Sequence, residues 1–275
     1  MVTEARTPYV AIDLAHGGRW TSLRLLGREW LWARDEPCRD SARPGDAFAD
    51  AGGLEECVPT VRGAPDHGAA WARPWRHDDG TDVVECEDFV VRRRLRADAL
   101  GVHAEYRLEA APGFRFVWAA HALLDLSAGA QVVLPLGTPV RVHREAAPYL
   151  AEPWPGDAPF VVGTWPEPLG LPLDRFGPDD GTAIGAIAVG CPGAVIVDGS
   201  DRLDLRVHAD APTSVALWRN LAGFPADRPY RSIGVEPMLG SVFDHAHARD
   251  DDDTVMVPDS GAVDWRLDIS AERAS

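Results

Sequence analysis

The chain has 275 residues, which is long for one domain but close to the about 200–250 residues that all-β sandwiches commonly reach as one unit. Its 43 acidic and 27 basic residues give a formal net charge of −16, which would repel nucleic-acid backbones and anionic membrane surfaces. All the basic residues are arginines, which excludes Schiff-base chemistry by lysine and a phosphate loop of the lysine-containing type.

The four cysteines are widely separated along the chain and form no Cys-x-x-Cys pair. The sequence also shows no cationic leader followed by an apolar core and no long uncharged apolar stretch. We therefore expect a soluble, cytoplasmic protein whose thiols pack as small buried hydrophobes. Only Cys57 lies close to the candidate site residues named below, the others being Cys38, Cys86 and Cys191.

Strand patterns begin near the amino end. Residues Arg19–Leu26 alternate between apolar and polar side chains, and Gly27-Arg28 then turns the chain into Glu29–Trp32. This pattern predicts a first β-hairpin.

A second hairpin is predicted in the middle of the chain. Asp98–Gly101 forms the turn, and the strand after it carries its apolar face on alternate residues of Val102–Leu108. In the strand before it, one face carries Phe89, Val91, Arg93 and Leu95.

Further strand candidates follow, and no segment shows a sustained helical period. We expect one all-β domain over residues 1–275, because Gly and Pro are scattered and nothing marks a linker. The long segment Glu145–Asp180 could form a rim loop over a site or a surface excursion. The remaining strand candidates are Arg115–His121, Gln131–Leu134, Gly193–Val197, Leu203–Val207 and Ser214–Trp218.

The carboxylate of Glu236 stands between a short apolar run and a proline. Strand alternation sends Ile233 and Val235 to one face and Glu236 to the other, and Pro237 has no backbone donor for continued pairing. We therefore expect Glu236 at a strand end facing a cavity or solvent, either as a general base or in a structural salt bridge.

Two histidines are candidates for the same chemistry. Alternation along Arg115–His121 places His121 opposite Trp118, on a face that lines a cavity or meets solvent. His67 stands between Asp66 and Gly68, a sequence that suits an ordinary turn or a close approach to a ligand. A glutamate and a histidine can accept and donate protons near neutral pH, but only the fold can assemble residues this far apart.

Several other residues have both functional and structural interpretations. The guanidinium of Arg73 suits vicinal hydroxyls or a phosphate, or else a surface ion pair. Trp71 offers a flat apolar face to a sugar ring or packs in the core. Glu55 either binds hydroxyls or faces water. We expect His245-Ala246-His247 and the acidic run Asp250–Asp253 to form a solvated loop rather than a metal site.

Four blocks together resemble the galactose mutarotase-like family, which includes aldose 1-epimerases and sugar-phosphate epimerases. The resemblance covers most of the chain, including the early Gly-Gly-Arg hairpin, although any single block is weakly specific. The blocks are Gly52–Thr60, Pro65–Trp75, Val117–His121 and Trp218–Pro237.

The resemblance implies a large antiparallel β supersandwich that holds a sugar or sugar phosphate and needs no metal or organic cofactor. It assigns Glu236 as the base, His121 as the acid and His67 as the donor that orients the sugar. We add Arg73, Asp66, Trp71 and Glu55 as candidate substrate ligands.

The expected activity is interconversion of the α and β anomers of an aldose. The alternatives are a hexose-6-phosphate 1-epimerase and a carbohydrate-binding protein without turnover. The segment Ala119–Leu123 lacks the Asn-His pair of galactose mutarotases, so the sequence leaves the sugar open, as it does the oligomeric state.

Overall fold

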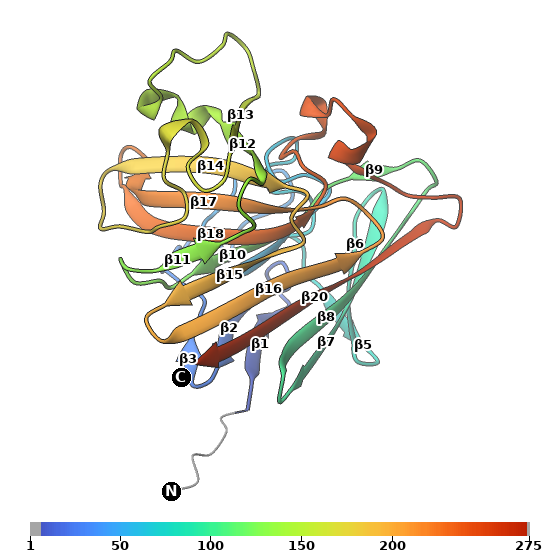
Figure 1. Cartoon of the computed structure of the whole chain (residues 1–275). Coiled ribbons are helices and arrows are strands. Elements are labelled where there is room, and N and C mark those ends of the chain that lie inside the picture. Colours follow the sequence, from blue (N-terminus) through green and yellow to red (C-terminus); the bar gives the residue numbers. More distant parts are fainter. Residues whose placement is uncertain (1–6, 274–275) are drawn as a thin grey trace, which may run out of the picture.

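The computed structural model describes residues 7–273, and this part of the chain consists mainly of β-strands in two large sheets (Figure 1). Neighbouring strands are antiparallel throughout both sheets. The expected all-β class and the large antiparallel supersandwich are therefore confirmed.

The first sheet has ten strands and carries the candidate site. Its strand β3 (Arg28–Glu29) pairs only with β2. In spatial order the other nine are β1 (Tyr9–Asp13), β2 (Arg19–Leu25), β4 (Leu54–Cys57), β10 (Trp118–Leu124), β18 (Tyr230–Leu239), β17 (Thr213–Phe224), β14 (Thr182–Val189), β12 (Pro139–His143) and β13 (Phe160–Thr164).

The second sheet has eight strands and covers one face of the first, with β15 and β16 packed against β17 and β18 (Figure 1). In spatial order they are β11 (Gln131–Val133), β15 (Gly193–Asp198), β16 (Asp201–Ala209), β20 (Ala262–Arg273), β8 (Gly101–Ala110), β7 (Phe89–Asp98), β6 (Thr81–Glu85) and β5 (Arg76–Asp78).

A small third sheet and four short 3-10 helices complete the described chain. The sheet pairs β9 (Arg115–Phe116) with β19 (Val255–Met256). The helices are η1 (Arg144–Tyr149), η2 (Pro168–Gly170), η3 (His245–His247) and η4 (Asp251–Asp253). None of the helical segments within residues 7–273 has the length and apolar character that crossing a membrane requires.

Both predicted hairpins are confirmed. In the first, β2 pairs with β3, and the turn lies one residue earlier than expected because Leu26 and Gly27 both adopt positive φ (54° and 81°). In the second, β7 pairs with β8 in the expected register, Asp98 opposite Gly101. The alternate residues Val102, Ala104, Tyr106 and Leu108 are buried as predicted.

The core between the sheets is rich in aromatic side chains. Trp265 of β20 stacks on Tyr106 of β8 with ring centroids 5.1 Å apart, and it lies 5.3 Å from the ring of Trp118 on β10. Contacts of this kind contribute about 0.5–1.5 kcal/mol each beyond the burial of their surface. Because Trp118 fills this core, its strand neighbour His121 points to the opposite face of the first sheet.

A charged cluster lies inside this core. Arg93 is fully buried and donates to Glu56 at 2.8 Å and to Asp82 at 3.1 Å. These two ion pairs explain why an arginine can lie on the apolar face of β7. Glu56 also accepts hydrogen bonds from Tyr106 and Trp118, each at 2.8 Å. Since a buried charge is costly unless it is paired, these bonds fix β4 firmly beneath the candidate site.

Three expectations about strands and loops were wrong. The predicted strand over Arg115–His121 is divided between β9 and β10, which belong to different sheets. The segment Glu145–Asp180 is not one loop, because it contains β13 at the edge of the first sheet. Within the expected solvated run, Asp253 is 1% exposed and binds Arg141 and Ser241.

The expected strand end at Pro237 was also wrong. Strand β18 continues to Leu239 and pairs with β17 on both sides of the proline, so Glu236 lies within the strand. On the other edge, β10 pairs with Met238 and with Gly234, but pairing is interrupted between them. The missing donor of Pro237 therefore affects one neighbouring strand rather than ending β18.

Candidate functional site

A cavity of about 590 Å³ lies on the face of the first sheet that is turned away from the second sheet. Its floor includes His121 and Glu236, and aromatic and charged side chains form its walls. The lining residues are Arg34, Glu36, Cys38, Ala47, Phe48, Ala49, Asp50, Val61, Arg62, Asp66, His67, His121, Glu145, Leu217, Trp218, Phe224, Pro225, Arg228, Tyr230, Glu236 and Phe243.

The strand register aligns the floor of this cavity. His121 of β10 pairs with Glu55 of β4, and the β10–β18 register places it opposite Glu236. Residues directly opposite across antiparallel strands share a face, with Cβ atoms about 4.5–5.5 Å apart. The sheet itself thus brings the histidine and the carboxylate together.

The acid and base candidates lie within reach of one small ligand. His121 Nε2 is 3.8 Å from Glu236 Oε1, and both side chains are buried, at 7% and 3% exposed. Gly234 lies two residues before Glu236 on the same face, and a Cβ there would come within 2.4 Å of Glu236 Oε1. Glycine at this position therefore leaves room for the carboxylate.

Burial dominates the electrostatics of Glu236. Loss of solvent raises the pKa of its carboxyl above the ordinary value, while His121 and Arg62 oppose this rise and Asp50 adds to it. A carboxyl with a raised pKa that is still near cationic groups suits reversible proton transfer close to neutral pH.

His67 reaches the cavity from the loop after β4. It has a φ of 56°, and Gly68 follows with a φ of 81°. A Cβ on Gly68 would lie 2.1 Å from the carbonyl oxygen of Val58, so glycine permits this loop to pack directly against the chain beyond β4. The His67 and His121 rings meet edge to face, with centroids 5.2 Å apart.

The segment before β4 forms one wall. Phe48 stacks on His67 with ring centroids 3.7 Å apart. Further along this wall, Asp50 accepts a 2.6 Å hydrogen bond from the hydroxyl of Tyr230, whose ring stacks on Trp32 at 5.6 Å. These contacts leave several aromatic surfaces around the space above His121.

A charged pair forms another part of the wall. Arg62 binds the carboxylate of Glu145, which lies at the start of η1, and its guanidinium is 4.9 Å from the ring centre of Phe243. A Cβ on Gly185 would come within 3.0 Å of Arg62, so β14 passes directly beneath this pair. Arg62 therefore supplies positive charge close to Glu236.

Four of the seven proposed site residues meet at this cavity: Glu236, His121, His67 and Asp66. Glu55 does not line it, because its carboxylate is 1% exposed and is held by Arg39 at 2.9 and 3.0 Å. Trp71 does not line it either, being fully buried and donating to the backbone oxygen of Asp66.

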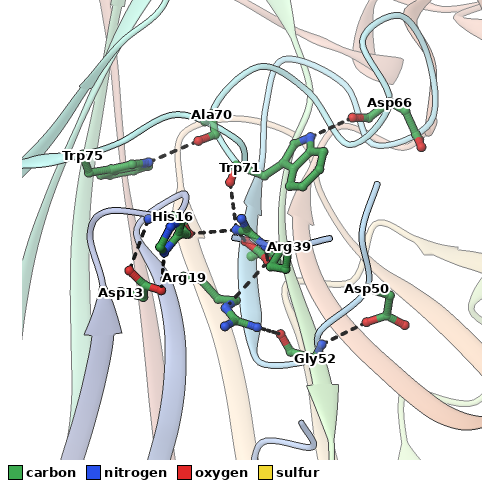
Figure 2. A network of polar contacts seen from close by, with 11 residues as sticks. Asp13, His16, Arg19, Arg39, Asp50, Gly52, Asp66, Ala70, Trp71 and Trp75 are labelled. Atoms are coloured by element: carbon green, nitrogen blue, oxygen red, sulfur yellow. Dashed lines mark hydrogen bonds and ion pairs between the residues drawn. The ribbon is translucent and has the colours of Figure 1, made fainter. Parts of the chain in front are cut away.

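Arg39 and Trp71 form a support behind the site (Figure 2). The Arg39 guanidinium also donates to the backbone oxygens of His16 and Trp71, at 2.8 and 2.9 Å. Arg73 lies on the outer side of this support and lines a separate hollow of about 430 Å³ together with His16, Arg39 and Arg43. The fold therefore separates Arg73 from His121 and Glu236.

The sequence reasoning missed several lining residues, among them Arg62, Phe48, Asp50 and Tyr230. All but Tyr230 come from irregular segments, where no periodicity shows which way a side chain points. The prediction that the thiols are buried was wrong for Cys38, which is exposed and lines the cavity. For Arg62, the only indication in the sequence was its position shortly after the block Gly52–Thr60.

Within residues 7–273, no group of three or more His, Cys, Asp or Glu side chains is arranged to hold a metal ion. The segment His245-Ala246-His247, for which the sequence favoured a solvated loop over a metal site, is not part of any such group among these residues. His245 and His247 lie in η3, and Asp253 of the acidic run is already engaged by Arg141.

Comparison with known proteins finds solved structures with a similar fold but no match by sequence. No protein-family model matches the sequence, and no curated protein matches it significantly. A proposed aldose 1-epimerase from Escherichia coli K12 is 13% identical, with a TM-score of 0.67 over 97% of this chain and 96% of that one.

Two further solved structures agree. A galactose mutarotase-like protein from Lactobacillus casei is 16% identical, with a TM-score of 0.59 over 98% of each chain. A proposed mutarotase from Salmonella typhimurium is 18% identical, with a TM-score of 0.58 over 97% of this chain and 88% of that one. The chain thus has the fold of the galactose mutarotase-like proteins.

Proposed function

We propose that the protein is an aldose 1-epimerase that interconverts the α and β anomers of an unphosphorylated aldose. The observation that carries this proposal is the buried pair of His121 and Glu236, which face one another at 3.8 Å on the floor of a cavity large enough for a sugar. The fold shared with proposed aldose 1-epimerases supports it.

The reaction needs one proton acceptor and one proton donor. Glu236 removes the proton from the anomeric hydroxyl while protonated His121 gives a proton to the ring oxygen. The bond between the anomeric carbon and the ring oxygen breaks, leaving an open-chain aldehyde. Rotation about the next carbon–carbon bond presents the other carbonyl face, and ring closure returns both protons.

The charges around the cavity favour a neutral sugar over a sugar phosphate. Arg34 is paired with Glu36 at 3.2 Å, and Arg62 is paired with Glu145. A phosphate binds best to arginines whose donors are free for bidentate contact. Of the three arginines that line the cavity, only Arg228 has no ion pair within residues 7–273, and it is exposed at the rim.

A carbohydrate-binding protein without turnover is the second candidate. Such a protein needs aromatic surfaces and hydrogen-bonding groups, which Trp218, Tyr230 and Asp50 provide. It does not need a buried carboxyl with a raised pKa beside an imidazole, since burying that charge costs free energy. The acid–base pair therefore favours an enzyme.

The test is anomer exchange followed by proton NMR for a panel of free aldoses and aldose 6-phosphates. With catalytic amounts of protein, we expect faster exchange than in buffer for at least one free aldose and a smaller effect on its 6-phosphate. Heat-denatured protein is the control. Acceleration of no sugar, with specific binding of one, would identify a binding protein instead.

A further inference from the structure

We infer that Asp66 is a positioning residue that fixes the ring tautomer of His67, so that His67 Nε2 accepts a hydrogen bond from the ligand. The inference about the tautomer rests on the geometry of these two side chains. Its catalytic consequence rests on the proposed function, because it leaves His121 as the group that protonates the ring oxygen.

The contact between the two side chains sets the position of the ring proton. Asp66 Oδ1 lies 2.9 Å from His67 Nδ1, and an ionised carboxylate can only accept a hydrogen bond. The proton must therefore be on Nδ1. The other ring nitrogen, Nε2, has no hydrogen-bond partner within residues 7–273, and the side chain lines the cavity.

The protonation states agree with this assignment. Hydrogen bonds from His67 and from the Phe48 backbone help to lower the pKa of Asp66 despite its partial burial, so the carboxyl is ionised at neutral pH. Burial lowers the pKa of His67 to about 4, against the opposing effect of Asp66. Near pH 7 the imidazole is neutral and carries one proton, which leaves a lone pair on Nε2.

Contacts with Phe48 and Trp71 hold the side chains of Asp66 and His67 in this orientation. Phe48 covers one face at a centroid distance of 3.7 Å, and its backbone N–H donates to Asp66 Oδ2 at 3.2 Å. Trp71 donates to the backbone oxygen of Asp66 at 3.0 Å. The Asp66 carboxylate and the Asp66 backbone oxygen are thus each held by a donor other than His67.

The two histidines therefore differ in what they can do. A sugar ring oxygen has no proton to give, so a neutral His67 with a lone pair on Nε2 would not bind it. It suits a hydroxyl, which donates. His67 thus orients the sugar as a hydrogen-bond acceptor, whereas the sequence resemblance implied a donor. The donor role falls to His121, which lies beside Glu236.

The substitution Asp66→Asn reverses the tautomer with almost no change in size. The Phe48 N–H needs an acceptor, so the amide oxygen takes the place of Oδ2 and the amide nitrogen faces His67 Nδ1. An amide N–H donates to Nδ1, which forces the ring proton to Nε2. The cavity then meets a donor where the native protein presents a lone pair.

Nitrogen-15 NMR of the histidine rings at pH 7, without sugar, tests the tautomer directly. His67→Gln assigns the His67 signals by their loss. We expect a protonated Nδ1 and an unprotonated Nε2 in the native protein, and the reverse in Asp66→Asn. A native His67 protonated on Nε2 or on both nitrogens would overturn the inference, whether or not the protein is an epimerase.

Asp50→Asn is the matched control, because it also removes one carboxylate from the cavity without touching His67. Its His67 tautomer should match that of the native protein. If anomer exchange is catalysed, Asp66→Asn should lower kcat/KM by roughly 10- to 100-fold, the effect of replacing one good hydrogen bond by a mismatched one. A reversed tautomer with unchanged kcat/KM would reject the role of His67 Nε2 as an acceptor.

Discussion

His121 Nε2 lies 3.8 Å from Glu236 Oε1, and the β10–β18 pairs on either side of the interruption place the two residues opposite one another. A pair held by the register of a sheet needs no loop closure to assemble, so little entropy is lost when a ligand arrives. The sequence separation of the two residues is large, but their separation in the fold is that of a single cross-strand pair.

We predict that the charges around Glu236 set the acidic limb of the pH–rate profile. Glu236 must be ionised to act as a base, so kcat/KM should fall as the pH drops through its raised pKa. Arg62→Gln removes a cation that lowers this pKa, and the limb should move to higher pH. Asp50→Asn removes an anion that raises it, and the limb should move to lower pH.

The measurement is kcat/KM for anomer exchange against pH in buffers of constant ionic strength. Arg34→Gln is the control, because Arg34 lines the same cavity but is not among the charges that shift the Glu236 pKa. Shifts in the same direction for Arg62→Gln and Asp50→Asn would show that Glu236 is not the group seen in the acidic limb.

We predict that Arg39 is essential for stability. Arg39→Met leaves Glu55 buried with only Arg19, 4.0 Å away, as a charged partner, which should lower the free energy of unfolding by about 3–5 kcal/mol. Replacing both with methionine should cost less than the sum of the single changes, because the two side chains are direct partners and no carboxylate is then left buried. Urea unfolding followed by tryptophan fluorescence measures all three variants.

The exposed pair of Arg24 and Glu29 provides the control for this experiment. Arg24→Met should change the free energy of unfolding by no more than about 0.5 kcal/mol, since the Arg24 side chain is 62% exposed. An Arg39→Met variant as stable as Arg24→Met would contradict the supporting role of Arg39.

We predict that His143 makes stability depend on pH. It is 6% exposed, its Nε2 has no hydrogen-bond partner, and burial lowers its pKa to about 3 from an ordinary value of 6.5. Between these values the unfolded chain binds a proton that the folded chain does not, so stability falls as the pH drops from 6.5 toward 3.

His143→Phe should remove this contribution, because the new ring remains among Phe160 and Phe243 but cannot titrate. The difference in unfolding free energy between native protein and variant should change by at most about 1.4 kcal/mol per pH unit, the value for one proton. Parallel stability curves for the two proteins over this pH range would contradict the prediction.

Periodic segments of the sequence were predictive of the fold. Alternation in β7 and β8 gave the correct faces and placed Arg93 on the same face as Phe89 and Val91, because the side-chain period of a strand is fixed by its backbone. Pro237 misled the prediction, since a proline in β18 disturbs pairing with β10 only and the sequence does not reveal which edge faces a neighbour.

The site could be predicted only where it lies on strands or follows from family resemblance. His121 and Glu236 lie on strands, and alternation placed His121 on the face opposite Trp118 and Glu236 on the face opposite Val235. Glu55 pairs with His121 across β4 and β10, but its partner Arg39 comes from an irregular segment. No local pattern could show that Arg39 would occupy its carboxylate.

The most direct test of the proton-acceptor role is the exchange rate of Glu236→Gln with the best aldose from the NMR panel. Glu36→Gln, a second glutamate of the cavity, is the matched control, and circular dichroism checks the fold. We predict that Glu236→Gln lowers kcat by roughly 10²–10⁴-fold with an unchanged fold, while Glu36→Gln shows a smaller decrease. A Glu236→Gln variant that exchanges anomers at the native rate would contradict the account.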